Sequence, residues 1–156
     1  MTGRTESLLE LLIRQESKVA ELYQLFSERD PDHRDFWRSM ADAELHHVSM
    51  IHELQGYIPS RQALLIEGKV RASTVKSFLA YVDGLLLRAK KEALPFTTAL
   101  SLSMDIEKSL VEKGMLDHFH GASAEVNAVL DRLKQETAGH GALMEEMWRR
   151  NRSPGK

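Results

Sequence analysis

The chain has 156 residues, a net charge of −2, 42% hydrophobic and 28% charged residues, and no cysteine. This length and composition are typical of one globular domain, 1–156, with a buried core, and the small net charge provides no general attraction for nucleic acid or membranes. Without cysteine, the chain has no disulfides, thiolate zinc sites, cysteine nucleophiles or iron–sulfur centres.

The first residues contain Arg and Glu and have no apolar signal core. No apolar run approaches the roughly 20 residues that a membrane span needs. Phosphate loops, catalytic triads and nucleic-acid motifs do not appear in the sequence. We therefore expect a cytoplasmic protein that binds neither nucleic acid nor membrane.

Apolar residues recur with helical spacing along most of the chain, and β-type alternation is not evident. Helices are predicted over 5–28, 34–55, 74–92, 96–118 and 123–150. Asp30-Pro31-Asp32 separates the first two, with Asp32 as the cap of the second, and Pro95 marks the start of the fourth. The connection 56–92, which includes its own helix, lets the second long hairpin join the first by a crossover. We predict an all-α, antiparallel four-helix bundle.

One face of each long helix is apolar except for polar residues near its middle. These residues are Glu16 on the first helix, Glu44 and His47 on the second, Glu107 on the helix after Pro95, and His140 on the last. A buried carboxylate is costly unless a positive charge compensates it, and a divalent metal ion is the simplest candidate. Carboxylate oxygen and imidazole nitrogen suit iron or manganese, and also zinc.

The spacing and order of these residues indicate whether they form one metal site or are separate polar residues with no common function. A single Glu or His on an apolar stripe is more often solvated at the edge of the stripe or satisfied by a neighbour. Glu44 and His47, however, are three residues apart and project from one face, so one helix can supply two ligands. The second hairpin repeats the order with Glu107 and His140, which favours a pseudo-twofold site between the hairpins.

This pattern resembles the rubrerythrin and ferritin-like di-iron carboxylate proteins, in which a Glu and a Glu-x-x-His are used twice. The match is carried by Glu16, Tyr23, Glu44-Leu45-His46-His47, Asp105-Ile106-Glu107-Lys108 and His140. The resemblance implies a ferritin-like bundle that holds one or two iron ions through Glu16, Glu44, His47, Glu107 and His140. It also implies oxidation of ferrous iron by peroxide or dioxygen, in oxidative-stress defence or iron handling. Without a rubredoxin-type centre, turnover would need an external electron donor.

The second half of the pattern departs from that family, because Thr137 stands where a Glu is expected. The neighbouring Glu136 lies about 100° around a regular helix. Glu136 reaches the site if the helix is distorted, and Gly139 and Gly141 favour such a distortion. The alternatives are that water takes the place of the missing carboxylate, or that only one metal ion binds well. The departure favours an alternative: a non-catalytic helical protein, metal-free or with a structural ion, that works by oligomerisation or partner binding.

Self-association is a further expectation. The helix 74–92 carries the apolar residues Val75, Phe78, Leu79, Val82, Leu85, Leu86 and Leu87. This is more apolar surface than one connecting helix easily buries, so we predict a homodimer or larger homo-oligomer. The alternative is that this helix packs entirely on its own bundle. His46 and His52 lie off the stripe and are expected on the surface or at an interface. Tyr23 is expected in the core, and the alternatives are a hydrogen bond to a ligand or a redox role.

Overall fold

The computed structural model describes residues 2–57, 65–66, 72–112, 120–121 and 124–152, with described side chains at 10–56, 76–109 and 124–151. Five α-helices occupy these residues: α1 (Thr2–Arg29), α2 (Arg34–Tyr57), α3 (Ala72–Lys91), α4 (Phe96–Glu112) and α5 (Ala124–Arg152). The only strands in the described part are two residues long, β1 (Leu65–Ile66) and β2 (His120–Gly121). The all-α prediction is confirmed.

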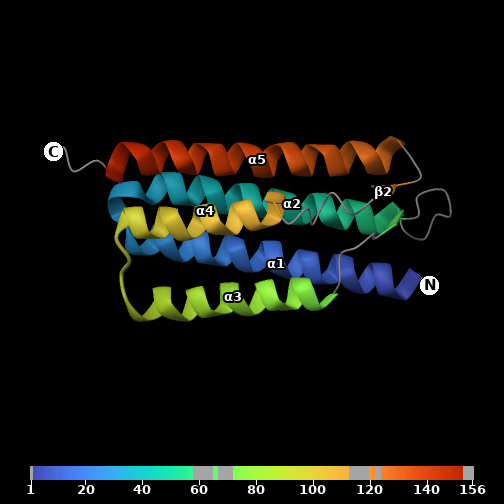
Figure 1. Cartoon of the computed structure of the whole chain (residues 1–156), viewed down its shortest axis with the longest axis horizontal. Helices are drawn as coiled ribbons and strands as arrows, with labels where there is room; N and C mark the ends of the chain where they lie inside the picture. The colour runs from blue at the N-terminus through green and yellow to red at the C-terminus, as the bar shows by residue number, and fades with distance from the viewer. Residues whose placement is uncertain (1, 58–64, 67–71, 113–119, 122–123, 153–156) are drawn as a thin grey trace.

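Successive helices run in opposite directions along one common axis (Figure 1). The helix α1 packs along both α2 and α3, α4 packs along α5, and α5 also contacts α2. Because α3 runs back along α1, α4 begins at the opposite end of the molecule from the end of α2 (Figure 1). The antiparallel pairing of β1 with β2 places Leu65 opposite Gly121 and joins two inter-helix connections at one end.

The turn between α1 and α2 corrects one detail of the prediction. It is a 3₁₀ helix, η1 (Pro31–His33), with Asp30 at its N-cap position. Asp32 therefore lies inside this short helix and is not the N-cap residue of α2, which begins at Arg34. Pro31 fits the first turn because its missing N–H is not needed there. The backbone N–H of His33 donates to the Asp30 carbonyl at 3.1 Å, and its ring Nδ1 lies 2.8 Å from Asp30 Oδ2.

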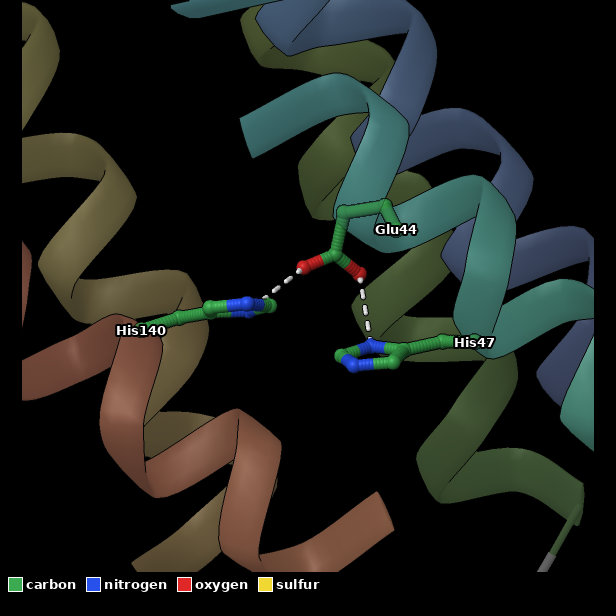
Figure 2. A group of neighbouring side chains, drawn as sticks. All are labelled: Glu44, His47 and His140. Atoms are coloured by element: carbon green, nitrogen blue, oxygen red, sulfur yellow. Dashed lines mark ion pairs between the residues drawn. The ribbon is translucent and has the colours of Figure 1, made fainter. Parts of the chain in front are cut away.

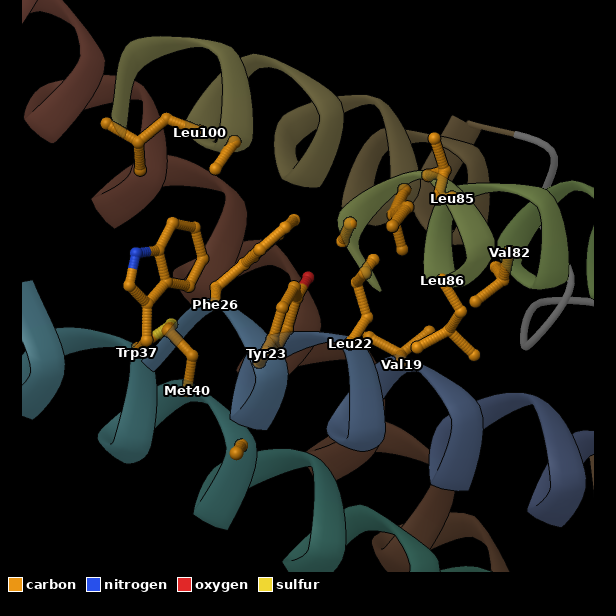
Figure 3. Packing of buried hydrophobic residues seen from close by; sticks show 14 of the residues in the cluster. Val19, Leu22, Tyr23, Phe26, Trp37, Met40, Val82, Leu85, Leu86 and Leu100 are labelled. Atoms are coloured by element: carbon orange, nitrogen blue, oxygen red, sulfur yellow. The ribbon is translucent and has the colours of Figure 1, made fainter. Parts of the chain in front are cut away.

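The apolar interior divides into two clusters along the bundle axis. The first comprises Leu11, Leu12, Met50, Ile51, Leu54, Leu79, Val126, Val129, Leu130 and Leu133. The second is larger and more aromatic, and includes Val19, Leu22, Tyr23, Phe26, Trp37, Met40, Val82, Leu85, Leu86 and Leu100 (Figure 3). Along α1, Glu16 falls between Leu12 of the first cluster and Val19 of the second. A buried polar layer therefore separates the two clusters.

The helix α3 buries most of its apolar face within its own chain. Phe78, Leu79, Val82, Leu85 and Leu86 are all buried, whereas Leu87 is 59% exposed. The side chain of Val75 lies outside the described residues. The surface that motivated a homodimer is thus largely covered by the bundle itself, and association of copies stays a prediction.

A matched pair of leucines tests the packing. Leu22→Ala removes a side chain with 0% exposure and should lower the free energy of unfolding by about 2–5 kcal/mol, because it leaves a cavity in the larger cluster. Leu87→Ala makes the same chemical change on the surface of α3 and should change that free energy by less than about 0.5 kcal/mol. Denaturant unfolding followed by circular dichroism measures both. Equal losses in the two variants would contradict this arrangement of the core.

Candidate metal centre

Four helices direct ionisable side chains into the polar layer. Glu16 comes from α1, Glu44 and His47 from α2, Glu107 from α4 and His140 from α5. Glu16 is 5% exposed, Glu44 and Glu107 are each 1% exposed, and His47 is fully buried. The side chain of His140 is 16% exposed. Glu16 and Glu107, which the sequence places on different hairpins, are therefore both inside the bundle.

Among the described residues, Glu44, His47 and His140 bring three ligand-type atoms close enough together to hold a metal ion. The Glu44 carboxylate lies between the two imidazoles, with one oxygen toward each ring (Figure 2). Both gaps, Glu44 Oε1 to His47 Nδ1 and Glu44 Oε2 to His140 Nδ1, are 3.6 Å. One atom from each residue lies within 4.8 Å of the others. Ligand atoms about 2.1 Å from one ion are about 3.0–3.4 Å apart, so these residues can hold a metal ion after a small contraction.

Glu16 and Glu136 lie on either side of the His47 ring, and Gln15 contacts Glu16. Glu16 Oε1 is 3.3 Å from His47 Nδ1, and Glu16 Oε2 accepts a hydrogen bond from Gln15 Nε2, also at 3.3 Å. On the other side of the ring, Glu136 Oε1 lies 3.1 Å from His47 Nε2. Since α5 is one continuous helix from Ala124 to Arg152, Glu136 reaches His47 without the helix distortion that was one of the three alternatives. It approaches His47 of the first hairpin, rather than His140.

Glu107 is held by a tyrosine from the opposite hairpin. The Tyr23 hydroxyl donates a hydrogen bond to Glu107 Oε2 at 2.7 Å, and both side chains are buried. Tyr23 is thus a core residue, as expected, and also fixes the position of a candidate ligand. Ser103, on the same stripe as Glu107, instead donates to the Ala99 carbonyl at 2.8 Å within its own helix. Gln15 is also buried, three residues after Leu12 and four before Val19, and the sequence did not single it out because no ligand motif includes a glutamine at this position.

The protonation states follow from burial and from these contacts. Burial, together with the charge of Glu16, raises the pKa of Glu44 to about 8. Burial alone would lower the pKa of His47, but the neighbouring carboxyl groups of Glu16, at 3.3 Å, and Glu44, at 3.6 Å, raise it to about 11. Burial also raises the pKa of Glu107 well above its ordinary range and lowers that of His140. For Glu16, the interactions with His47 and Glu44 outweigh burial and lower the pKa. Without a metal, protons and the His47 charge compensate the buried carboxylates at neutral pH.

Several buried polar atoms of the site have no hydrogen-bond partner within the described part of the chain. They are both carboxylate oxygens of Glu44, Oε1 of Glu107 and Nδ1 of His140; elsewhere, Gln15 Oε1 and Trp37 Nε1 share this property. Most buried polar atoms in proteins do have partners. Carboxylate oxygens and an imidazole nitrogen with free lone pairs are the donor set that a divalent cation of the iron, manganese or zinc type binds, so the residues fit such an ion.

The surface predictions for two other histidines are confirmed, because His46 and His52 are both exposed. The segment Asp117 to Phe119 lies outside the described residues, and His120 is part of β2. None of the described helices combines the length and the apolar character needed to cross a bilayer.

No protein-family model, curated protein or solved structure matches the chain. The likeness to rubrerythrin-like proteins therefore rests on the residues themselves.

The protonation states predict that metal binding is coupled to proton release. Ligands bind metals in their deprotonated forms. Glu44 must lose a proton below its pKa of about 8, and His47, with a pKa of about 11, must lose one throughout the neutral range. The apparent affinity for Mn²⁺ should therefore increase from pH 6 to pH 8, by about tenfold per pH unit for each proton displaced. Calorimetry in buffers with different ionisation enthalpies counts the protons, and an affinity independent of pH would contradict this assignment.

Proposed function

We propose that this protein binds iron in the interior of a ferritin-like bundle, at two adjacent positions that share Glu44. The observation that carries the proposal is the buried Glu44 carboxylate, which lies between imidazoles from two different helices while both of its oxygens lack a hydrogen-bond partner among the described residues. The ferritin-like assignment is supported by the four helices that supply the polar layer and by α3, which lies in the connection between the two hairpins.

The two halves of the proposed site differ in charge. The first half-site comprises Glu16, Glu44 and His47, with Glu136 also within 3.1 Å of His47. The second half-site comprises Glu44, Glu107 and His140. Thr137 precedes His140 by three residues, as Glu44 precedes His47, and is 2% exposed, so it occupies the equivalent buried position with a neutral hydroxyl. Each half-site has two carboxylates and one histidine, but only the first has a further carboxylate, Glu136, beside its histidine. Because hard divalent ions depend on anionic oxygen, the second position binds its ion more weakly.

The proposed chemistry follows from the donor set and from the likeness to rubrerythrin-like proteins. Few protein ligands per ion leave coordination positions free for an oxidant. Bound ferrous iron would supply electrons to peroxide or dioxygen, in oxidative-stress defence or iron handling. Because the chain contains no cysteine, it has no thiolate redox centre of its own. An external electron donor must therefore return the iron to the ferrous state for each new turnover.

A specific observation favours a second candidate function, in which the bundle works without a metal as an oligomerisation or partner-binding protein. Charged His47 already compensates carboxylates on both sides of its ring, with Glu16 at 3.3 Å and Glu136 at 3.1 Å. Tyr23 likewise satisfies one oxygen of Glu107. An interior of this kind can be stable with protons in place of a metal ion. The two functions are separated by metal content and by the effect of a chelator on stability.

Two adjacent histidines provide a matched test of metal binding. His47→Ala removes a buried ligand and should abolish tight binding of Fe²⁺ or Mn²⁺, whereas His46→Ala changes an exposed residue and should leave binding unchanged. Elemental analysis of protein purified without chelator, followed by anaerobic calorimetric titration, measures both. A metal that binds only the folded protein should also raise its melting temperature, and a chelator should reverse the increase. Metal-free protein whose melting temperature does not respond to added metal would support the second function instead.

The charge difference between the half-sites predicts the stoichiometry. The natural protein should bind one ion tightly and a second weakly or not at all. Thr137→Glu should tighten binding of the second ion and raise the rate of peroxide-dependent iron oxidation, because it adds the missing carboxylate. Thr137→Gln, which is similar in size to Glu but neutral, should leave the second ion weak and is the control for a purely steric effect. Two equally tight ions in the natural protein would show that another carboxylate replaces the missing one, with Glu136 the first candidate.

A further inference from the structure

We propose that a cleft between α4 and α5 admits a small carboxylate anion, such as formate or acetate, which completes the second half-site in place of the carboxylate that Thr137 lacks. The inference rests on the proposed metal function and identifies an exogenous ligand for the same site. The anion would bind through the metal ion rather than to the protein alone, because Glu44 and Glu107 otherwise present only carboxyl groups to it.

The cleft connects the protein surface with the second half-site. It has a volume of about 250 Å³, and Glu107 and Thr137 are among the residues that line it. Its α5 side includes the small residues Ala138, Gly141 and Ala142, of which the two alanines are exposed. A Cβ atom at Gly141 would lie 3.7 Å from Glu107 Cβ, so any side chain longer than that of alanine would press on this candidate ligand. The cleft has more volume than a two-carbon acid occupies, and small side chains form part of its wall.

The chemistry at the inner end of the cleft calls for an oxygen donor with a negative charge. Oε1 of Glu107 has no hydrogen-bond partner within the described residues, and Thr137 offers only a hydroxyl. An ion held there by Glu107, His140 and one oxygen of Glu44 would have two carboxylate ligands, as in the first half-site, but no further carboxylate in the position that Glu136 takes beside His47. A small carboxylate restores the missing charge and supplies an oxygen pair of the same chemistry as the Glu that the pattern predicts at this position.

The charges at the rim are compatible with an anion. The exposed side chain of Lys108 lines the cleft. Glu145 also lines it, but its carboxylate accepts a hydrogen bond from Arg149 at 2.6 Å, so its charge is largely compensated. The rim therefore carries an excess positive charge that attracts anions rather than cations.

Cobalt binding in the presence of acetate tests the inference. The metal-free natural protein is titrated with Co²⁺ in sodium acetate and in sodium perchlorate at equal ionic strength, with free Co²⁺ corrected for its weak acetate complex. Visible absorption of Co²⁺ reports the coordination change. In 100 mM acetate the second ion should bind about tenfold more tightly, which corresponds to a dissociation constant for acetate of about 10 mM. Thr137→Glu should bind the second ion tightly in both salts, because its own carboxylate takes the position.

Variants of the cleft test the route. Ala142→Leu should remove the acetate effect while leaving the first ion unchanged, and Ala138→Leu is a second variant of the same wall. Ser101→Leu is the control, since Ser101 lines a separate cleft on the same two helices and is exposed. Acetate dependence that persists in both alanine variants would overturn the route, and identical titrations of the natural protein in the two salts would overturn the ligand. If neither the natural protein nor Thr137→Glu binds any Co²⁺, it is the metal function itself that fails.

Discussion

The interior of this protein is governed by the cost of burying carboxylates halfway along a helical bundle. Glu44 and Glu107 are almost completely inaccessible to water, and Glu16 is nearly so. A carboxylate in such an environment must take up a proton, pair with a cation or bind a metal. The two apolar clusters lie on either side of this layer and provide the burial that makes the compensation necessary. The burial of these carboxylates between two apolar clusters therefore determines both the packing of the interior and the chemistry of the site.

Protons and a metal ion compete for the same atoms in this layer. In the metal-free protein, His47 is charged and pairs with Glu16, while Glu44 retains a proton because its pKa is about 8. A divalent ion at Glu44 would replace the positive charge of the proton with a larger one and recruit the free lone pair of His140. The metal-binding and metal-free functions therefore use the same residues, and the free energy of exchanging protons for metal decides between them.

Much of the fold and of the polar layer could be predicted from sequence, because both depend on the helical period. Spacings of three and four residues placed Glu16, Glu44 and Glu107 on buried stripes, and Pro95 marked the start of α4. Contacts made by the ends of long side chains could not be predicted in this way. Glu136 leaves a regular helix about 100° from the stripe and still reaches His47, because its side chain is long and the helices are close. The extent to which α3 covers α1 depends on packing between helices, which periodicity does not describe.

The asymmetry of the proposed site has a physical consequence for its chemistry. The first half-site is rich in carboxylates and enclosed by Glu16 and Glu136, so an ion there is held by charge. The second has no counterpart of Glu136, and the Tyr23 hydrogen bond fixes Glu107 beside a cleft that opens to solvent. An oxidant needs both a free coordination position and a path from solvent, and on this arrangement only the second ion has both. At the proposed site, a neutral Thr137 at the buried position would thus weaken the binding of one ion and leave that same ion next to the cleft.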